Sequence, residues 1–150
     1  NSPWFPNSSV TDAAMSQPVP TAHSAPVPTL RDRLMAIPGL SATEGLHAVG
    51  GDVDLYARLL TMLLESDLPA KLHGELLAGH ATGGQQAAHT FKGVAATLGA
   101  NQLRDQATEI DHQLRTLSDG AVPQALCQQA ARMQQDFDAL TAAIRTALQP

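Results

Sequence analysis

Two stretches in the second half of the chain carry apolar residues at steps of three and four, the spacing of one helix face. The apolar positions are Leu103, Ala107, Ile110, Leu114 and Leu117, and then Leu126, Ala130, Met133, Phe137, Leu140, Ile144 and Leu148. Both stripes are coiled-coil-like. Ser118-Asp119-Gly120 is expected to end the first helix, and so short a connection favours two antiparallel neighbours within one chain.

Caps and helix breakers predict further helices upstream of these two. We expect helices over 30–37, 41–49, 53–65, 67–79 and about 84–98. The segment after Asp52 is apolar on most sides, which predicts a buried helix. We interpret Thr82-Gly83-Gly84-Gln85 as a turn followed by a helix cap.

The composition supports an all-α fold. Aromatic residues make up only 3% of the 150 residues, and Ala, Leu and Gln, which favour helices, outnumber the β-branched residues. We predict an antiparallel up-and-down four-helix bundle over 30–150, with short extra helices at its N-terminal end. Residues 1–29 hold six of the ten prolines and one charged residue, Asp12, and are predicted to be a flexible linker. Because the chain does not begin with Met, we expect it to be a piece of a longer protein.

Charge and residue content exclude several classes of function. The net charge of -5, from 9 basic and 14 acidic residues, argues against nucleic-acid binding. No apolar run approaches the ~20 residues of a membrane span. The single cysteine, Cys127, rules out an internal disulfide and fits a reducing compartment. Glu109 and His112 have the Glu-x-x-His spacing of di-iron bundles, but such sites need a second motif, so no metal site is expected.

The helix expected over 84–98 has two distinct faces. The inward stripe is Ala88, Phe91, Ala95 and Leu98, and a second stripe, expected to face solvent, is Gln85, His89, Lys92, Gly93 and Ala96. A glycine in mid-helix costs about 1 kcal/mol relative to Ala, and a patch without side chains would let a partner approach His89 closely. The spacing alone is also consistent with an alternative in which His89 and Lys92 are exposed residues without a function and Gly93 is merely tolerated.

The residues around His89 resemble a known family. His89-Thr90-Phe91-Lys92-Gly93, followed by Leu98-Gly99-Ala100 and Leu103, resembles the phosphoacceptor helix of histidine-containing phosphotransfer (HPt) domains. Pro38-Gly39-Leu40, Gly45-Leu46, Gly50-Gly51-Asp52 and Leu55-Tyr56 resemble the opening of such domains in bacterial hybrid sensor kinases. The resemblance covers about residues 34–148 and leaves the linker out.

The resemblance implies a phosphocarrier that takes a phosphoryl group on His89 from one receiver-domain aspartate and passes it to another. Lys92 would then stabilise the phosphoryl charge, and Asp111, at the position of the family's hydrogen-bonding residue, would accept from Nδ1–H of the ring. The receiver is expected to dock around Gln85, Gln86, Gly93 and Ala96 and to bring its own Mg²⁺. The chain would hold no cofactor, and without the ATP-binding kinase boxes it would not be an enzyme by itself.

The same resemblance implies a monomeric, cytoplasmic domain without direct membrane contact, at the C-terminal end of a sensor histidine kinase that is membrane-bound. A chemotaxis-kinase phosphotransfer module stays open, because an acidic residue at position 111 favours it, whereas the Pro-rich segment favours a hybrid kinase. Kinase dimerisation domains are disfavoured, because their histidine is followed by an acidic residue and soon by Pro, whereas Thr90 follows here. The alternative from another class of function is a non-catalytic helical domain that binds other proteins.

Overall fold

The computed structural model describes residues 26–117 and 121–150, and within these ranges every regular element is a helix. The helices are α2 (Leu30–Met35), α3 (Ala42–Ala48), α4 (Val53–Leu64), α5 (Leu68–Leu77), α6 (Ala81–Leu98), α7 (Asn101–Thr116) and α8 (Gln124–Leu148). The all-α prediction is therefore confirmed. Most of the predicted linker, residues 1–25, and the predicted helix end at Ser118-Asp119-Gly120 lie outside the described residues.

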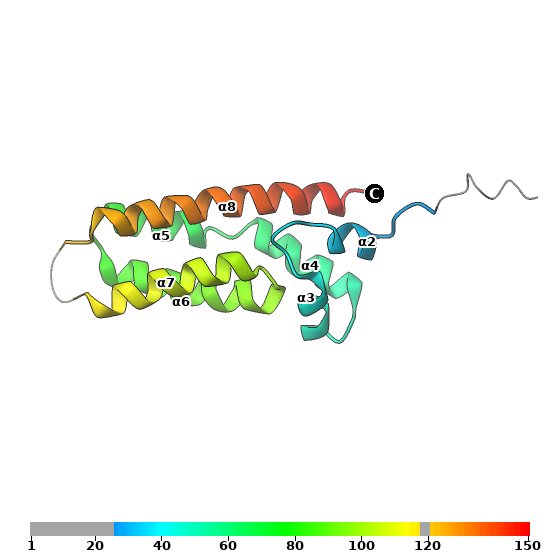
Figure 1. Cartoon of the computed structure of the whole chain (residues 1–150), viewed down its shortest axis with the longest axis horizontal. Coiled ribbons are helices and arrows are strands. Elements are labelled where there is room, and N and C mark those ends of the chain that lie inside the picture. Colours follow the sequence, from blue (N-terminus) through cyan, green and yellow to red (C-terminus); the bar gives the residue numbers. More distant parts are fainter. Residues whose placement is uncertain (1–25, 118–120) are drawn as a thin grey trace, which may run out of the picture.

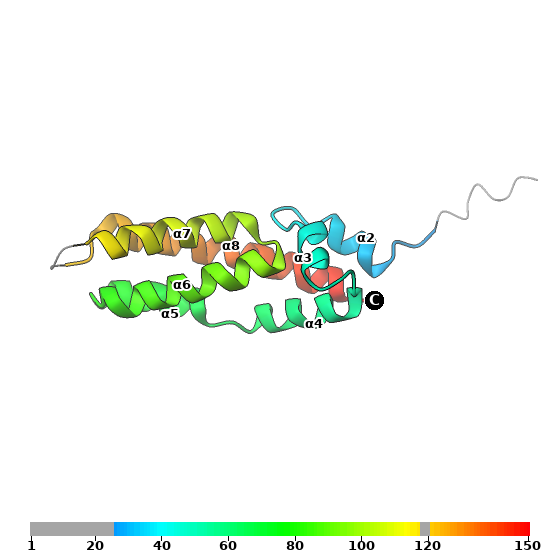
Figure 2. The same ribbon diagram turned by 90° about the horizontal axis from the view of Figure 1, so that it is seen from below.

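Four of the helices form the bundle. Helices α5, α6, α7 and α8 each pack against the next, and α5 also packs against α8, which closes the ring. Consecutive helices run in opposite directions (Figure 1), so the predicted up-and-down topology is confirmed. The long helix α8 contacts α4 as well as α5, and these two follow one another along it (Figure 2). The short helices α2 and α3 lie at the end of the bundle near the C-terminus.

The turn between α6 and α7 is fixed by contacts with α3 and α4. Gly99 ends α6 in the left-handed conformation, at φ 82°, and its carbonyl accepts a 2.8 Å hydrogen bond from the Ser41 amide. A Cβ at Gly99 would collide with the Ser41 carbonyl. The Tyr56 hydroxyl donates to the Leu98 carbonyl at 2.6 Å, and Gly45 leaves space for the Tyr56 ring. Glycine is needed at positions 45 and 99 because other chain segments lie against them.

Helix α4 is less buried than its sequence predicts. Only Tyr56, Leu60 and Leu63 are buried, whereas Met62 is 67% exposed. The prediction of a helix buried on most sides is wrong, because α4 packs beside the bundle, against α8, α6 and α3, and leaves the side that carries Met62 exposed.

Helix α6 begins earlier than predicted. Residues 82–85, interpreted from the sequence as a turn, lie inside the helix, which starts at Ala81. The turn comes before them, at Gly79, where φ is 81°. Gly83 and Gly84 instead allow α6 to pack closely on α5, because a Cβ at Gly84 would collide with Leu76.

Candidate functional site

Helix α6 buries one face and presents His89 on another. The predicted inward residues Ala88, Phe91, Ala95 and Leu98 are all buried, and the Phe91 ring packs edge-to-face on Phe137 of α8 with ring centroids 5.7 Å apart. Position 89 is two residues from Phe91, and therefore faces away from the core. The His89 side chain is 56% exposed.

Helix α7 supplies a carboxylate and a guanidinium beside this histidine. Asp111 and Arg115 are one turn apart, at spacing i, i+4, and therefore share a face of α7. The Asp111 side chain is only 4% exposed, although it is charged. A buried carboxylate needs hydrogen-bonding partners to compensate for the water it loses.

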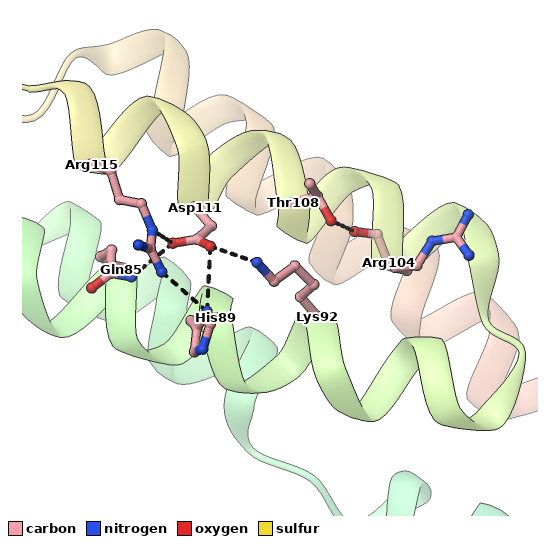
Figure 3. Close-up of polar contacts among 7 residues, drawn as sticks. All are labelled: Gln85, His89, Lys92, Arg104, Thr108, Asp111 and Arg115. Atoms are coloured by element: carbon pink, nitrogen blue, oxygen red, sulfur yellow. Dashed lines mark hydrogen bonds and ion pairs between the residues drawn. The ribbon is translucent and has the colours of Figure 1, made fainter.

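Three side chains provide those partners (Figure 3). Gln85 Nε2 donates to Asp111 Oδ1 at 2.8 Å, Arg115 Nε donates to the same oxygen at 2.9 Å, and Lys92 Nζ donates to Oδ2 at 2.9 Å. Burial alone would raise the pKa of Asp111, but the hydrogen bonds from Gln85, Lys92 and Arg115 outweigh it and hold the pKa well below its ordinary value. Asp111 is therefore an anion near neutral pH.

The imidazole of His89 meets this cluster through one ring nitrogen. Nδ1 lies 3.5 Å from Asp111 Oδ2 and 3.2 Å from Arg115 Nη2. Nε2, on the other side of the ring, is therefore the nitrogen that is left for a partner. The cluster beside the ring holds two cations, Lys92 and Arg115, and one anion, Asp111, so its formal charge is positive in a chain whose net charge is -5. Such a setting suits an anionic group at Nε2.

The structure brings the predicted site residues His89, Lys92 and Asp111 together. Of the predicted docking residues, Gln86, Gly93 and Ala96 are exposed. Gln85 is half-buried and donates to Asp111, and Lys92 is also half-buried against α7. The prediction that this whole stripe of α6 faces solvent is therefore wrong, because α7 packs along one edge of it.

Arg115 is the residue that the sequence analysis missed. Its position four residues after Asp111 was the available signal, because a basic residue at i+4 faces the same surface as an acidic one at i. Its guanidinium reaches both Asp111 and His89.

An apolar groove of about 750 Å³ runs between α4 and α6 beside this site. Gly93 lines it, and apart from the adjoining backbone of α6 no atom would lie within 4 Å of a Cβ at Gly93. The α4 wall includes Leu59 and the exposed Met62, and Thr90 and Val94 lie on the α6 side. The groove therefore adjoins the face of α6 that presents His89.

Other features of the described residues give no second site. Glu109 accepts a hydrogen bond from Gln113 at 2.8 Å, and His112 is exposed. No group of three or more His, Cys, Asp or Glu side chains within 26–117 and 121–150 could hold a metal ion. None of the helices in these ranges is long and apolar enough to cross a membrane.

The chain matches the model of a known protein family. A family model described as "Hpt domain" matches residues 58–147. The matched region begins within α4, ends within α8 and includes all residues of the His89 cluster. No curated protein matches the chain significantly, and neither does any solved structure.

Proposed function

Because the chain belongs to the Hpt domain family, whose members carry phosphoryl groups in two-component phosphorelays and interact with receiver domains, we propose that His89 is its phosphoacceptor. In this proposal Nε2 accepts the group from the aspartyl phosphate of one receiver domain and passes it to the aspartate of another. The observation that carries it is the exposed His89 ring, whose Nδ1 lies 3.5 Å from a buried carboxylate.

The transfer step uses the lone pair of Nε2. That pair forms the N–P bond, the P–O bond to the receiver aspartate breaks, and its electrons stay on the leaving carboxylate. In the reacting tautomer the ring carries its proton on Nδ1, and it becomes positively charged when the N–P bond forms. Asp111 stabilises this cation by accepting from Nδ1–H, and it is already ionised for that role.

Lys92 is proposed to stabilise the phosphoryl charge. It is one turn from His89 on α6, and its ammonium is held by Asp111. A cation already in position costs little reorganisation when negative charge develops. The Mg²⁺ that aids the receiver aspartate is proposed to arrive with the receiver domain.

The receiver is proposed to dock over the exposed face of α6 and the adjoining α4–α6 groove. Gly93 is central to this surface, because it keeps the approach to His89 free of side chains. Gln86 and Ala96 are exposed on the same helix. Gln85 contributes from the edge of this surface, where it also holds Asp111.

The location and oligomeric state of the domain, and the kind of protein it belongs to, are proposed from the sequence. We propose that the isolated domain is a cytoplasmic monomer without an ATP site. Its parent would be a hybrid sensor histidine kinase, with a chemotaxis-kinase module as the alternative that the acidic Asp111 favours.

Transfer from a ³²P-labelled receiver domain with Mg²⁺, followed by phosphopeptide mapping, tests the proposed acceptor. We expect the label on the peptide that contains His89, and we expect it to be acid-labile and base-stable, as phosphohistidine is. Label on a different peptide, or acid-stable label, would contradict the proposal.

A further inference from the structure

One guanidinium connects the buried carboxylate to the phosphoacceptor candidate. Arg115 Nε donates to Asp111 Oδ1 at 2.9 Å, while Arg115 Nη2 lies 3.2 Å from His89 Nδ1. Figure 3 shows the side chain bridging the two residues. The Arg115 side chain is 53% exposed, so it has room to leave this position. The inference below rests on the proposed role of His89.

Arg115 and Asp111 require opposite protonation of the same ring nitrogen. A guanidinium only donates hydrogen bonds, so Nδ1 must present a lone pair to Arg115, which places the proton of the neutral ring on Nε2. A carboxylate only accepts, so a hydrogen bond from Nδ1 to Asp111 needs the proton on Nδ1. Only one of these two hydrogen bonds can exist at a time in the neutral ring.

The distances favour the bond from Arg115. Nδ1 is 3.2 Å from Arg115 Nη2 but 3.5 Å from Asp111 Oδ2, which is beyond the usual range of a hydrogen bond. The Oδ2 atom already accepts from Lys92 at 2.9 Å. The geometry therefore corresponds to a ring with its proton on Nε2, and in that tautomer Nε2 has no lone pair free for attack on phosphorus.

We propose that Arg115 is a positioning residue that controls the tautomer of His89, holding the proton on Nε2 until the receiver's phosphoryl group draws the guanidinium away. Arginine forms strong, forked hydrogen bonds with phosphoryl oxygens, which supplies the attraction. When Arg115 leaves, the Nε2 proton passes to water and Nδ1 takes a proton from water. Asp111 then accepts from Nδ1–H, and Nε2 has the lone pair that forms the N–P bond. The reactive tautomer is thereby favoured only when a phosphoryl group is present.

NMR of the unphosphorylated protein tests the tautomer directly. Ring ¹⁵N shifts of His89 would be recorded over a pH series for the parent, Arg115→Met and Arg104→Met, and the proteins would be compared at a pH where the shifts themselves report a neutral ring. Arg104 is the matched control, because it lies on α7 and pairs with Asp105 rather than with His89. We expect Nε2–H to dominate in the parent and in Arg104→Met, and the ratio of Nδ1–H to Nε2–H to rise at least about threefold in Arg115→Met.

A ratio in Arg115→Met equal to that of the parent would overturn the proposal. So would a parent whose neutral ring mainly carries Nδ1–H, a result that needs no variant. Unchanged backbone amide spectra away from the site would show that each variant is folded.

Phosphorylation by phosphoramidate, a small donor that needs no docking, gives a second readout. At saturating phosphoramidate, where any loss of donor binding through Arg115 no longer limits the rate, we expect Arg115→Met to be labelled on His89 at least about twofold faster than the parent, and Arg104→Met to match the parent. An equal or slower rate in Arg115→Met would contradict tautomer control. Failure of His89 to accept label in any of the proteins would instead contradict the proposed function, and the NMR result would distinguish the two failures.

Discussion

The ammonium of Lys92 lies 2.9 Å from Oδ2 of Asp111, so the cation one turn from His89 is anchored to the neighbouring helix. The anchor keeps Lys92 beside the ring, with 30% of its side chain exposed. It also gives Asp111 two roles, because the carboxylate holds the cation and faces Nδ1 of His89 at 3.5 Å.

Removal of the Lys92 ammonium should slow phosphoryl transfer without abolishing it. Groups that stabilise developing charge are typically worth about 10²–10³ in rate, so we expect Lys92→Ala to lose about 10²-fold in receiver-to-domain transfer, measured by rapid quench. Lys71→Ala, at an exposed position on α5, is the control and should transfer at the parent rate. A Lys92→Ala rate within about twofold of the parent would mean that Lys92 is not part of the transfer site.

Asp111 should make the fold sensitive to acid. Its folded-state pKa lies below the ordinary value of 3.8, so its contribution to the free energy of unfolding is present above that value and is lost as the pH falls toward the folded-state pKa. Asp111→Asn should lose about 1–2 kcal/mol near neutral pH, because charge-assisted hydrogen bonds disappear. As the pH falls from 7, the free energy of unfolding of Asp111→Asn should decrease less than that of the parent. Urea unfolding from pH 7 downward measures both effects.

The control for this pH dependence is Asp54→Asn, because Asp54 is exposed in the first turn of α4. We expect this variant to show the acid sensitivity of the parent. Parallel stability curves for the parent and Asp111→Asn between pH 7 and pH 2 would show that Asp111 is not held as a buried anion.

Gly93 tests the docking surface, because helix stability and access to His89 favour different residues there. Apart from the adjoining backbone of α6, no atom would lie within 4 Å of a Cβ at Gly93, so Gly93→Ala should stabilise the protein by up to about 1 kcal/mol. Gly93→Leu should keep most of that gain and yet slow transfer from the receiver more than about tenfold, because its side chain would stand in the approach to His89.

Gly74→Leu is the matched control for Gly93→Leu. Gly74 lies within α5, also has no atom within 4 Å of a Cβ, and does not line the α4–α6 groove. We expect it to fold at least as well as the parent and to transfer at the parent rate. Full transfer by a well-folded Gly93→Leu would mean that the receiver approaches over another face.

Tyr56 should give the fold an alkaline limit. Burial raises the pKa of Tyr56 to about 12 from 10.0, so its contribution to stability is complete below pH 10 and is lost as the pH rises toward 12. Tyr56→Phe should lower the free energy of unfolding at pH 7 by about 1 kcal/mol, since the hydrogen bond to the Leu98 carbonyl disappears. Thermal melts between pH 7 and pH 11 measure both; a variant that loses stability at high pH as steeply as the parent would contradict this assignment.

The sequence was sufficient for features that depend on local periodicity. The three-and-four spacing of apolar residues predicted α7 and α8 and the buried face of α6, because a helix places such residues on one side whatever surrounds it. Asp52 and Asp67 were also local signals of helix starts, and both directly precede a helix. The Asp52 side chain caps α4 by accepting from the Leu55 amide, whereas the Asp67 side chain makes no capping hydrogen bond.

Several features that depend on contacts between helices were not predicted from the residue pattern, whereas the family resemblance did predict Asp111 beside His89. The sequence pattern predicted a turn at Gly83 and Gly84, but both residues lie within α6. Their lack of a side chain gives space to α5, which packs against them. Gln85 looked solvent-facing, yet α7 brings Asp111 within 2.8 Å of its amide. Arg115 was overlooked because the i, i+4 spacing indicates only its contact with Asp111 within α7, whereas its contact with His89 depends on the register of α7 against α6.

Labelling of His89→Gln and His112→Gln beside the parent tests the central claim most directly. Both histidines are exposed on the bundle, so neither change should disturb the core. After incubation with a phosphorylated receiver domain and Mg²⁺, we expect the parent and His112→Gln to carry equal amounts of acid-labile label and His89→Gln to carry none. Label on a folded His89→Gln, or loss of label in His112→Gln alone, would contradict the assignment of His89 as the phosphoacceptor.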